Sequence, residues 1–98
     1  MKVSEITTEY IADYLRIDEP EEIQLREIEA TKAAAIAYAS SYTGLTVEEL
    51  DEHEDIAIAV MVQISDMYEN RNLYLDYKSK EINKTVTNIL GLYQNNLV

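Results

Sequence analysis

The chain has 98 residues, contains no cysteine and carries a formal net charge of −11 at pH 7. Its length predicts a single domain spanning residues 1–98 with one modest hydrophobic core. The lack of cysteine excludes disulfides, thiolate nucleophiles and cysteine-bound metals, and the acidic balance argues against direct binding to nucleic acid phosphates.

The first predicted helix begins after Thr7, whose hydroxyl can accept a hydrogen bond from an amide of the first turn. Ile11, Tyr14 and Leu15 are expected to share one face of this helix. The sequence Asp18-Glu19-Pro20 then interrupts the helix. Proline disfavours the α conformation in the residue before it and suits the first turn of a new helix, so a second helix is expected at once.

A long second helix is predicted from Glu21 to Tyr42. Its larger apolar and alanine residues recur at helical spacing, namely Leu25, Ile28, Ala35, Ala39 and Tyr42. The alanine-rich run 33–39 combines high helix propensity with side chains small enough for close helix approach. Thr43-Gly44 should end the helix, because glycine readily adopts the left-handed C-cap conformation.

A short helix around residues 47–52 and a longer one from about Glu54 are expected next. Thr46-Val47-Glu48-Glu49 fits the capping-box pattern at the start of the short helix. The following apolar run is rich in β-branched residues and resembles a strand in composition. Its length and a step of four identify a helix instead; the residues in step are Ile56, Val60, Ile64 and Tyr68.

The segment 73–78 alternates apolar and polar residues, which predicts an extended arm or short strand. A last helix from about Asn83 carries Val86, Ile89, Leu90 and Tyr93 on one side. This face should dock on the domain or on a neighbouring subunit, and Gly91 should weaken the helix. The predicted fold is therefore all-α: a small bundle of about four helices with a loosely structured arm before the C-terminal helix.

No residue is assigned to catalysis, to a cofactor or to a metal, and an enzyme is not expected. His53 lies in the acidic run 48–55, but the spacing matches neither an EF-hand loop nor the HExxH motif. Carboxylate pairs such as Asp51 and Asp55 lie four residues apart, yet nothing in the sequence separates their pKa values. A solvated acidic surface is the preferred interpretation of this run.

The residues Tyr68-Glu69-Asn70-Arg71 close the apolar run with aromatic, amide and guanidinium groups, which favour hydrogen-bonded packing over covalent chemistry. Arg71 could bind a carboxylate of its own domain or one on a neighbouring subunit. The remaining tyrosines suit core and interface positions, because each buries a large ring and keeps one polar end. The longest charge-free apolar window, 56–65, is about half the roughly 20 residues of a membrane span, so a soluble protein is expected.

Three motifs together resemble the head–tail connector (adaptor) family of tailed bacteriophages and prophages: Leu15-Arg16-Ile17-Asp18, Tyr42-Thr43-Gly44 and Tyr68-Glu69-Asn70-Arg71. The resemblance implies a structural protein that forms a ring, dodecameric in the particle, beneath the portal protein. Such a ring extends the DNA channel, lets DNA pass without specific binding, and docks tail-completion or stopper proteins. The implied location is the head–tail interface of the virion, and the host bacterial cytoplasm during assembly.

The resemblance also implies roles for particular residues. Leu15 and Ile17 would seat the first helix, Tyr42, Thr43 and Gly44 would end the second and turn the chain, and Tyr68, Asn70 and Arg71 would hold the end of the central helix. The segment 75–98, with Ile89, Leu90 and Tyr93, would be the candidate for portal contact.

The acidic excess lies in residues 1–55, which hold 15 acidic and 4 basic side chains, whereas residues 56–98 hold 4 of each. Glu48, Glu49 and Glu52 are therefore candidates to line the channel. The main alternative is a small acidic regulatory protein or nucleic-acid mimic that binds a basic partner. A hydrolase using Asp51 and Asp55 is a third hypothesis.

Overall fold

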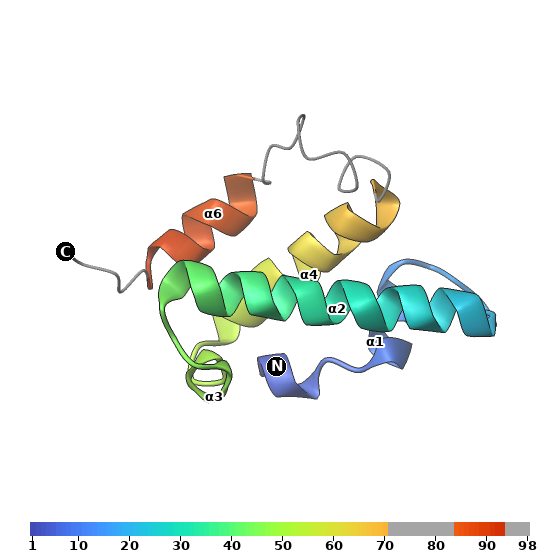
Figure 1. Cartoon of the computed structure of the whole chain (residues 1–98), viewed down its shortest axis with the longest axis horizontal. Helices are drawn as coiled ribbons and strands as arrows, with labels where there is room; N and C mark the ends of the chain where they lie inside the picture. The colour runs from blue at the N-terminus through green and yellow to red at the C-terminus, as the bar shows by residue number, and fades with distance from the viewer. Residues whose placement is uncertain (71–83, 94–98) are drawn as a thin grey trace.

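The computed structural model describes residues 1–70 and 84–93, and these residues form helices without any strand (Figure 1). The elements are η1 (Val3–Glu5), α1 (Thr8–Tyr14), α2 (Glu22–Thr43), α3 (Val47–Leu50), α4 (Glu54–Glu69) and α6 (Lys84–Gly91). The predicted all-α bundle is confirmed, with four helices of seven or more residues. The predicted arm at 73–78 and Arg71 lie outside the described residues.

Helices α2 and α4 pack against each other, and the other elements gather around this pair (Figure 1). Helix α6 contacts both α4 and α2, α1 and α3 contact α2, and η1 contacts α4. The predicted step of four on α4 is confirmed, since Ile56, Val60, Ile64 and Tyr68 are all buried. They share one hydrophobic cluster with Ile28, Ala35 and Ala39 of α2 and with Val86 and Leu90 of α6.

The helix starts follow the predicted capping chemistry. The Thr7 hydroxyl accepts a hydrogen bond from the Tyr10 amide at 3.0 Å and begins α1. In the capping box of α3, the Thr46 hydroxyl accepts from the Glu49 amide at 3.1 Å, and a Glu49 carboxylate oxygen accepts from the Thr46 amide at 2.8 Å. These bonds satisfy amides that have no partner within the first turn of the helix.

Two predicted core positions are more exposed than expected. Tyr14 is 50% exposed although it shares α1 with the buried Ile11, because it lies on the flank of Ile11 that borders an open groove. Leu25 is 36% exposed and lies near the N-terminal end of α2, which extends beyond α1 in Figure 1. In contrast, Val3 and Ile6, which were not predicted as core residues, are buried at the N-terminal end of the chain.

Gly44 has a left-handed backbone conformation and Gly91 lies in a helix, so replacing each by alanine should change the free energy of unfolding in opposite directions. Gly44 has a φ of 78° at the C-cap of α2, where a Cβ costs about 1–2 kcal/mol. Gly91 ends α6, and among the described residues a Cβ there would meet no atom within 4 Å other than those of its chain neighbours and its own helix backbone. Gly91→Ala should therefore raise the free energy of unfolding by about 0.5–1 kcal/mol, and Gly44→Ala should lower it. Urea denaturation followed by circular dichroism measures both; equal signs would contradict this account.

Candidate protein interface: a groove between α1 and α4

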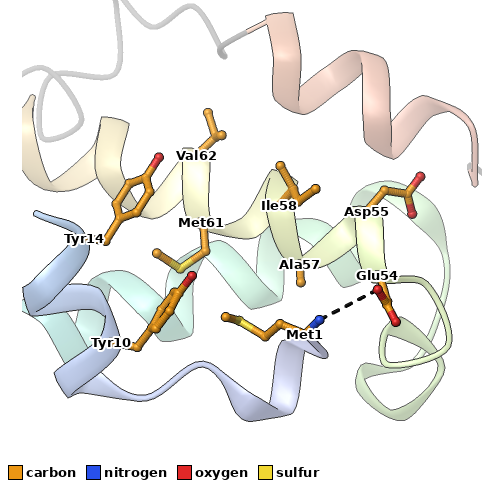
Figure 2. Close-up of a pocket in the computed structure, with 9 residues that line it drawn as sticks. All are labelled: Met1, Tyr10, Tyr14, Glu54, Asp55, Ala57, Ile58, Met61 and Val62. Atoms are coloured by element: carbon orange, nitrogen blue, oxygen red, sulfur yellow. Dashed lines mark ion pairs between the residues drawn. The ribbon is translucent and has the colours of Figure 1, made fainter.

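An apolar groove of about 460 Å³ lies between the N-terminal residues, α1 and α4 (Figure 2). Its lining residues are Met1, Tyr10, Tyr14, Glu54, Asp55, Ala57, Ile58, Met61 and Val62. Figure 2 shows the two tyrosines side by side at one end, the α4 side chains along the middle and the two carboxylates at the other end. The groove thus has an apolar centre and an acidic end.

The groove exists because α4 is apolar around most of its circumference and α1 is too short to cover it. Helix α1 has seven residues, and its buried side chains are Ile11 and Ala12. Ile58, on the side of α4 opposite Ile56 and Val60, is left 58% exposed. A helix with apolar side chains on all sides is normally covered on all sides, so this surface is suited to a further contact.

The tyrosines widen the apolar surface around Ile58. Tyr10 and Tyr14 stand one turn apart on α1 and are 42% and 50% exposed. Tyrosine is enriched in protein interfaces because it buries a large ring while its hydroxyl keeps a polar partner. Met61 and Ala57 lie between the exposed side chains and are almost fully buried. The arrangement has the composition of an interface centre.

The acidic end of the groove is held by contacts with both chain ends of the described structure. A Glu54 carboxylate oxygen lies 3.8 Å from the Met1 amino group, and the Glu54 side chain is 83% exposed. The Tyr93 hydroxyl lies 2.8 and 2.7 Å from the two carboxylate oxygens of Asp55 and donates its proton to that group. The His53 ring lies 4.2 Å from the Tyr93 ring between centroids. The two contacts of Tyr93 join the end of α6 to the start of α4, and the Met1–Glu54 pair joins the N-terminus to the same place.

The Tyr93–Asp55 hydrogen bond should make stability depend on alkaline pH. The bond to Asp55 raises the pKa of the Tyr93 phenol, because only the neutral phenol can donate. A raised folded-state pKa contributes stability below the ordinary tyrosine value, about 10, and the contribution is lost as pH rises through the folded value. Tyr93→Phe should therefore be less stable than the native chain at pH 7, and the difference should shrink above pH ~10.

Thermal unfolding from pH 7 to 11 measures this effect, with Tyr10→Phe as a matched loss of a phenol. Burial, and secondarily Tyr42, also raises the pKa of Tyr38, so the native chain and both variants share that alkaline loss. The difference in stability between Tyr93→Phe and Tyr10→Phe therefore reports the contribution of the Tyr93 phenol alone. A constant difference between the native chain and Tyr93→Phe across this range would contradict the assignment.

The residues predicted from the three motifs serve mainly in packing and helix termination. Leu15 and Ile17 pack at the edge of the core, and Tyr68 is buried. The rings of Tyr42 and Tyr38 lie 5.7 Å apart. Other motif positions end helices: Gly44 caps α2, and the Asn70 side-chain amide donates to the carbonyl and the carboxylate of Asp66 at 3.1 and 3.0 Å.

The predicted C-terminal face packs on its own chain. Leu90 is buried against α4 and α2, Ile89 is half-buried, and Tyr93 bonds Asp55. The sequence allows this face to dock on the domain or on a neighbour, and the described part of the helix docks on the domain. Arg71 and the rest of the segment 75–98 beyond 84–93 lie outside the described residues, so their predicted contacts stay predictions.

The acidic candidates Glu48, Glu49 and Glu52 are exposed on and just after α3, and none of them lines the groove. Nearby, the Asp51 carboxylate accepts a hydrogen bond from the Ser4 amide at 2.9 Å. Hydrogen bonding from the Ser4 side chain, and secondarily from its backbone amide, lowers the pKa of Asp51 and ties η1 to the end of α3. The channel-lining role expected for Glu48, Glu49 and Glu52 stays a prediction.

Sequence analysis did not single out Tyr10, Tyr14 and Ile58 as an exposed site. The available signal was the apolar run 56–67, which places apolar side chains on more than one face of a helix.

In the described ranges 1–70 and 84–93, no three acidic or histidine side chains are grouped so that they could hold a metal ion. Within the same ranges, no helix is long and apolar enough to cross a membrane. Comparisons of this chain with models of protein families, with curated proteins and with solved structures find no match.

Proposed function

We propose that this chain is a structural head–tail connector (adaptor) protein of a tailed bacteriophage or prophage. The observation that carries the proposal is the apolar groove, which exposes Ile58, Tyr10 and Tyr14 on a strongly acidic protein. A surface of this kind is suited to burial against another protein. A nucleic-acid mimic would act through its carboxylates and would have no use for the groove.

The positions of the three resemblance motifs support the same proposal. The first motif follows α1, the second ends α2, and the part of the third within the described residues ends α4. Each motif therefore coincides with the end of a helix, where Gly44 and Asn70 determine the direction of the outgoing chain. A shared pattern of helix ends is what related helical proteins would retain.

In this function the chain forms a ring, dodecameric in the particle, beneath the portal protein. It extends the DNA channel and docks tail-completion or stopper proteins. The acidic surface repels the DNA backbone, so DNA passes without specific binding. The protein acts at the head–tail interface of the virion and assembles in the host cytoplasm.

Sedimentation velocity of the purified chain, alone and mixed with the portal protein of the same phage or prophage, tests the proposal. A connector should co-sediment with the portal as one defined complex over a range of salt concentrations. The second candidate, an acidic mimic favoured by the net charge of −11, should ignore the portal and bind a basic protein with strong salt dependence. A chain that stays small beside the portal would overturn the connector proposal.

Removing the acidic charge near α3 should slow genome ejection if these carboxylates face the channel. The variant combines Glu48→Lys and Glu52→Lys with Glu49→Gln, because glutamine can keep the capping-box hydrogen bond. Added positive charge would hold the passing DNA backbone.

The control for this variant combines Glu9→Lys and Glu29→Lys with Glu69→Gln, which changes the net charge equally at exposed positions elsewhere. The rate of DNA release from particles carrying each variant measures the effect. Equal rates for the two variants would place Glu48, Glu49 and Glu52 away from the DNA.

A further inference from the structure

The side of α2 that faces away from the core carries mainly small, uncharged side chains. We define the α2 outer face by Ile23, Arg26, Ala30, Ala34, Ala37 and Ser41, which recur every three or four residues. All six are exposed, and Ile23 is 62% exposed. They lie opposite Ile28, Ala35 and Ala39, which face the core. Only one of the six positions is charged, although 28% of the chain is charged.

The groove and the α2 outer face look in opposite directions. On α4, the exposed groove residue Ile58 lies on the side away from Ile56 and Val60, which face the core shared with α2. On α2, the outer face points away from that same core. Figure 1 has α2 in front of α4, whereas Figure 2 has α4 in front of α2 and the groove toward the viewer.

The two surfaces differ in the size of their side chains. The groove presents large exposed side chains from Tyr10, Tyr14 and Ile58, with Ala57 and Met61 between them. The α2 outer face presents small side chains, which allow two helices to approach to about 8 Å between their axes. Because α2 has 22 residues and is about 33 Å long, its outer face can cross the whole groove.

The two surfaces offer one pair of opposite charges, in which Arg26 lies beside the exposed Glu22 and Glu54 lies 3.8 Å from the Met1 amino group. The Arg26 side chain is 74% exposed and pairs with Glu22 of its own helix. At the acidic end of the groove, Glu54 is 83% exposed and Asp55 already accepts the Tyr93 hydrogen bond. Arg26 of one copy can therefore approach Glu54 of another copy, where opposite charges meet at the edge of an apolar contact.

We propose that the groove of one copy of this chain receives the α2 outer face of a second copy. The inference rests on the proposed function, because it identifies the surfaces through which connector subunits meet. Since the two surfaces differ and point in opposite directions, the contact is heterologous. Each copy that is added leaves one free groove or one free α2 outer face, to which a further copy can bind. Such a contact closes into a ring when the rotation between neighbours allows it. The net charge opposes it, so added salt should strengthen the contact by screening.

The lack of cysteine allows a direct test with single-cysteine variants, Ala34→Cys on α2 and Val62→Cys at the edge of the groove, which leave Ile58 in place. The two proteins are mixed in equal amounts and treated with a short bis-maleimide, with and without the portal protein. The mixed pair should cross-link several-fold more than either variant alone, and a chain carrying both substitutions should form a ladder. The control replaces Ala34→Cys by Asn88→Cys, an exposed position on α6.

Each outcome decides the proposal. Dominant cross-linking of Ala34→Cys with itself would show a symmetric α2 contact and overturn the proposal, as would a mixed pair no better than the Asn88→Cys control. Co-sedimentation with the portal but no cross-link between Ala34→Cys and Val62→Cys would refute this contact and leave the connector function intact. The cross-link without portal binding would support the contact and refute the connector function.

Discussion

Replacing Ile64 by alanine should lower the free energy of unfolding by about 2–5 kcal/mol, whereas Ile58→Ala should change it by about 0.5 kcal/mol or less. The two residues are isoleucines on the same helix, but Ile64 is 0% exposed and Ile58 is 58% exposed. Alanine at Ile64 leaves a cavity in the cluster shared by α2, α4 and α6. A total stability of about 5–15 kcal/mol is normal for a small domain, so the loss at Ile64 would be a large part of it.

Urea denaturation at equal protein concentration measures the difference between the two variants. The same pair also separates folding from assembly: Ile58→Ala should keep its circular dichroism spectrum and urea midpoint but lose self-association in sedimentation velocity. Ile64→Ala should lose stability first. Equal destabilisation by the two substitutions would mean that the groove is covered within the chain, and would remove the basis of the proposed contact.

Sequence could predict the ends of helices because those depend on neighbouring residues. Thr7 and Thr46 each accept a hydrogen bond from the amide three residues ahead, and Gly44 adopts its positive φ without a steric penalty from a Cβ. The apolar steps of α4 are likewise local, since Ile56 and Val60 lie on the same face of any helix. These features need no knowledge of what packs against them.

Burial at the N-terminus could not be predicted in the same way. Residues 1–6 are too few for a periodic pattern, yet Val3 and Ile6 are buried because η1 packs on α4. The Ser4 amide bonds Asp51, which is 47 residues away in the chain. Which face of a short segment is buried therefore depends on a partner that local sequence does not identify.

The candidate interface shows the same division. The motif residues Tyr68 and Asn70 were predicted to hold the end of the central helix, and Tyr68 is buried there while Asn70 caps the helix. The groove instead depends on how far α1 extends along α4, and its acidic end depends on a hydrogen bond between Tyr93 and Asp55, 38 residues apart. Tyr14 follows the apolar spacing of α1 but stays exposed, because it borders the groove that α1 does not cover.

The turn after α2 leads to the second large prediction. Thr43 is fully buried, and its hydroxyl donates to the Ala39 carbonyl at 2.8 Å and accepts from the Leu45 amide at 3.1 Å. Thr43→Val keeps the shape of the side chain but leaves the Leu45 amide without this acceptor. The substitution should lower the free energy of unfolding by about 1–3 kcal/mol, the cost of a buried polar group without a partner. Urea denaturation measures the loss.

Thr43→Ser is the matched control because it keeps the hydroxyl and removes one methyl group, which costs about 0.8 kcal/mol. Amide hydrogen exchange at Leu45 distinguishes the two effects: Thr43→Val should speed exchange at this amide more than Thr43→Ser does. If Thr43→Val left both the free energy of unfolding and the hydrogen-exchange protection of the Leu45 amide unchanged, the role of the Thr43 hydroxyl would be contradicted. Ser40 also donates to the Leu45 carbonyl at 2.6 Å, so both backbone groups of Leu45 are bound by side chains from the last turn of α2. Together with Gly44, these bonds explain why the chain turns at this point toward α3.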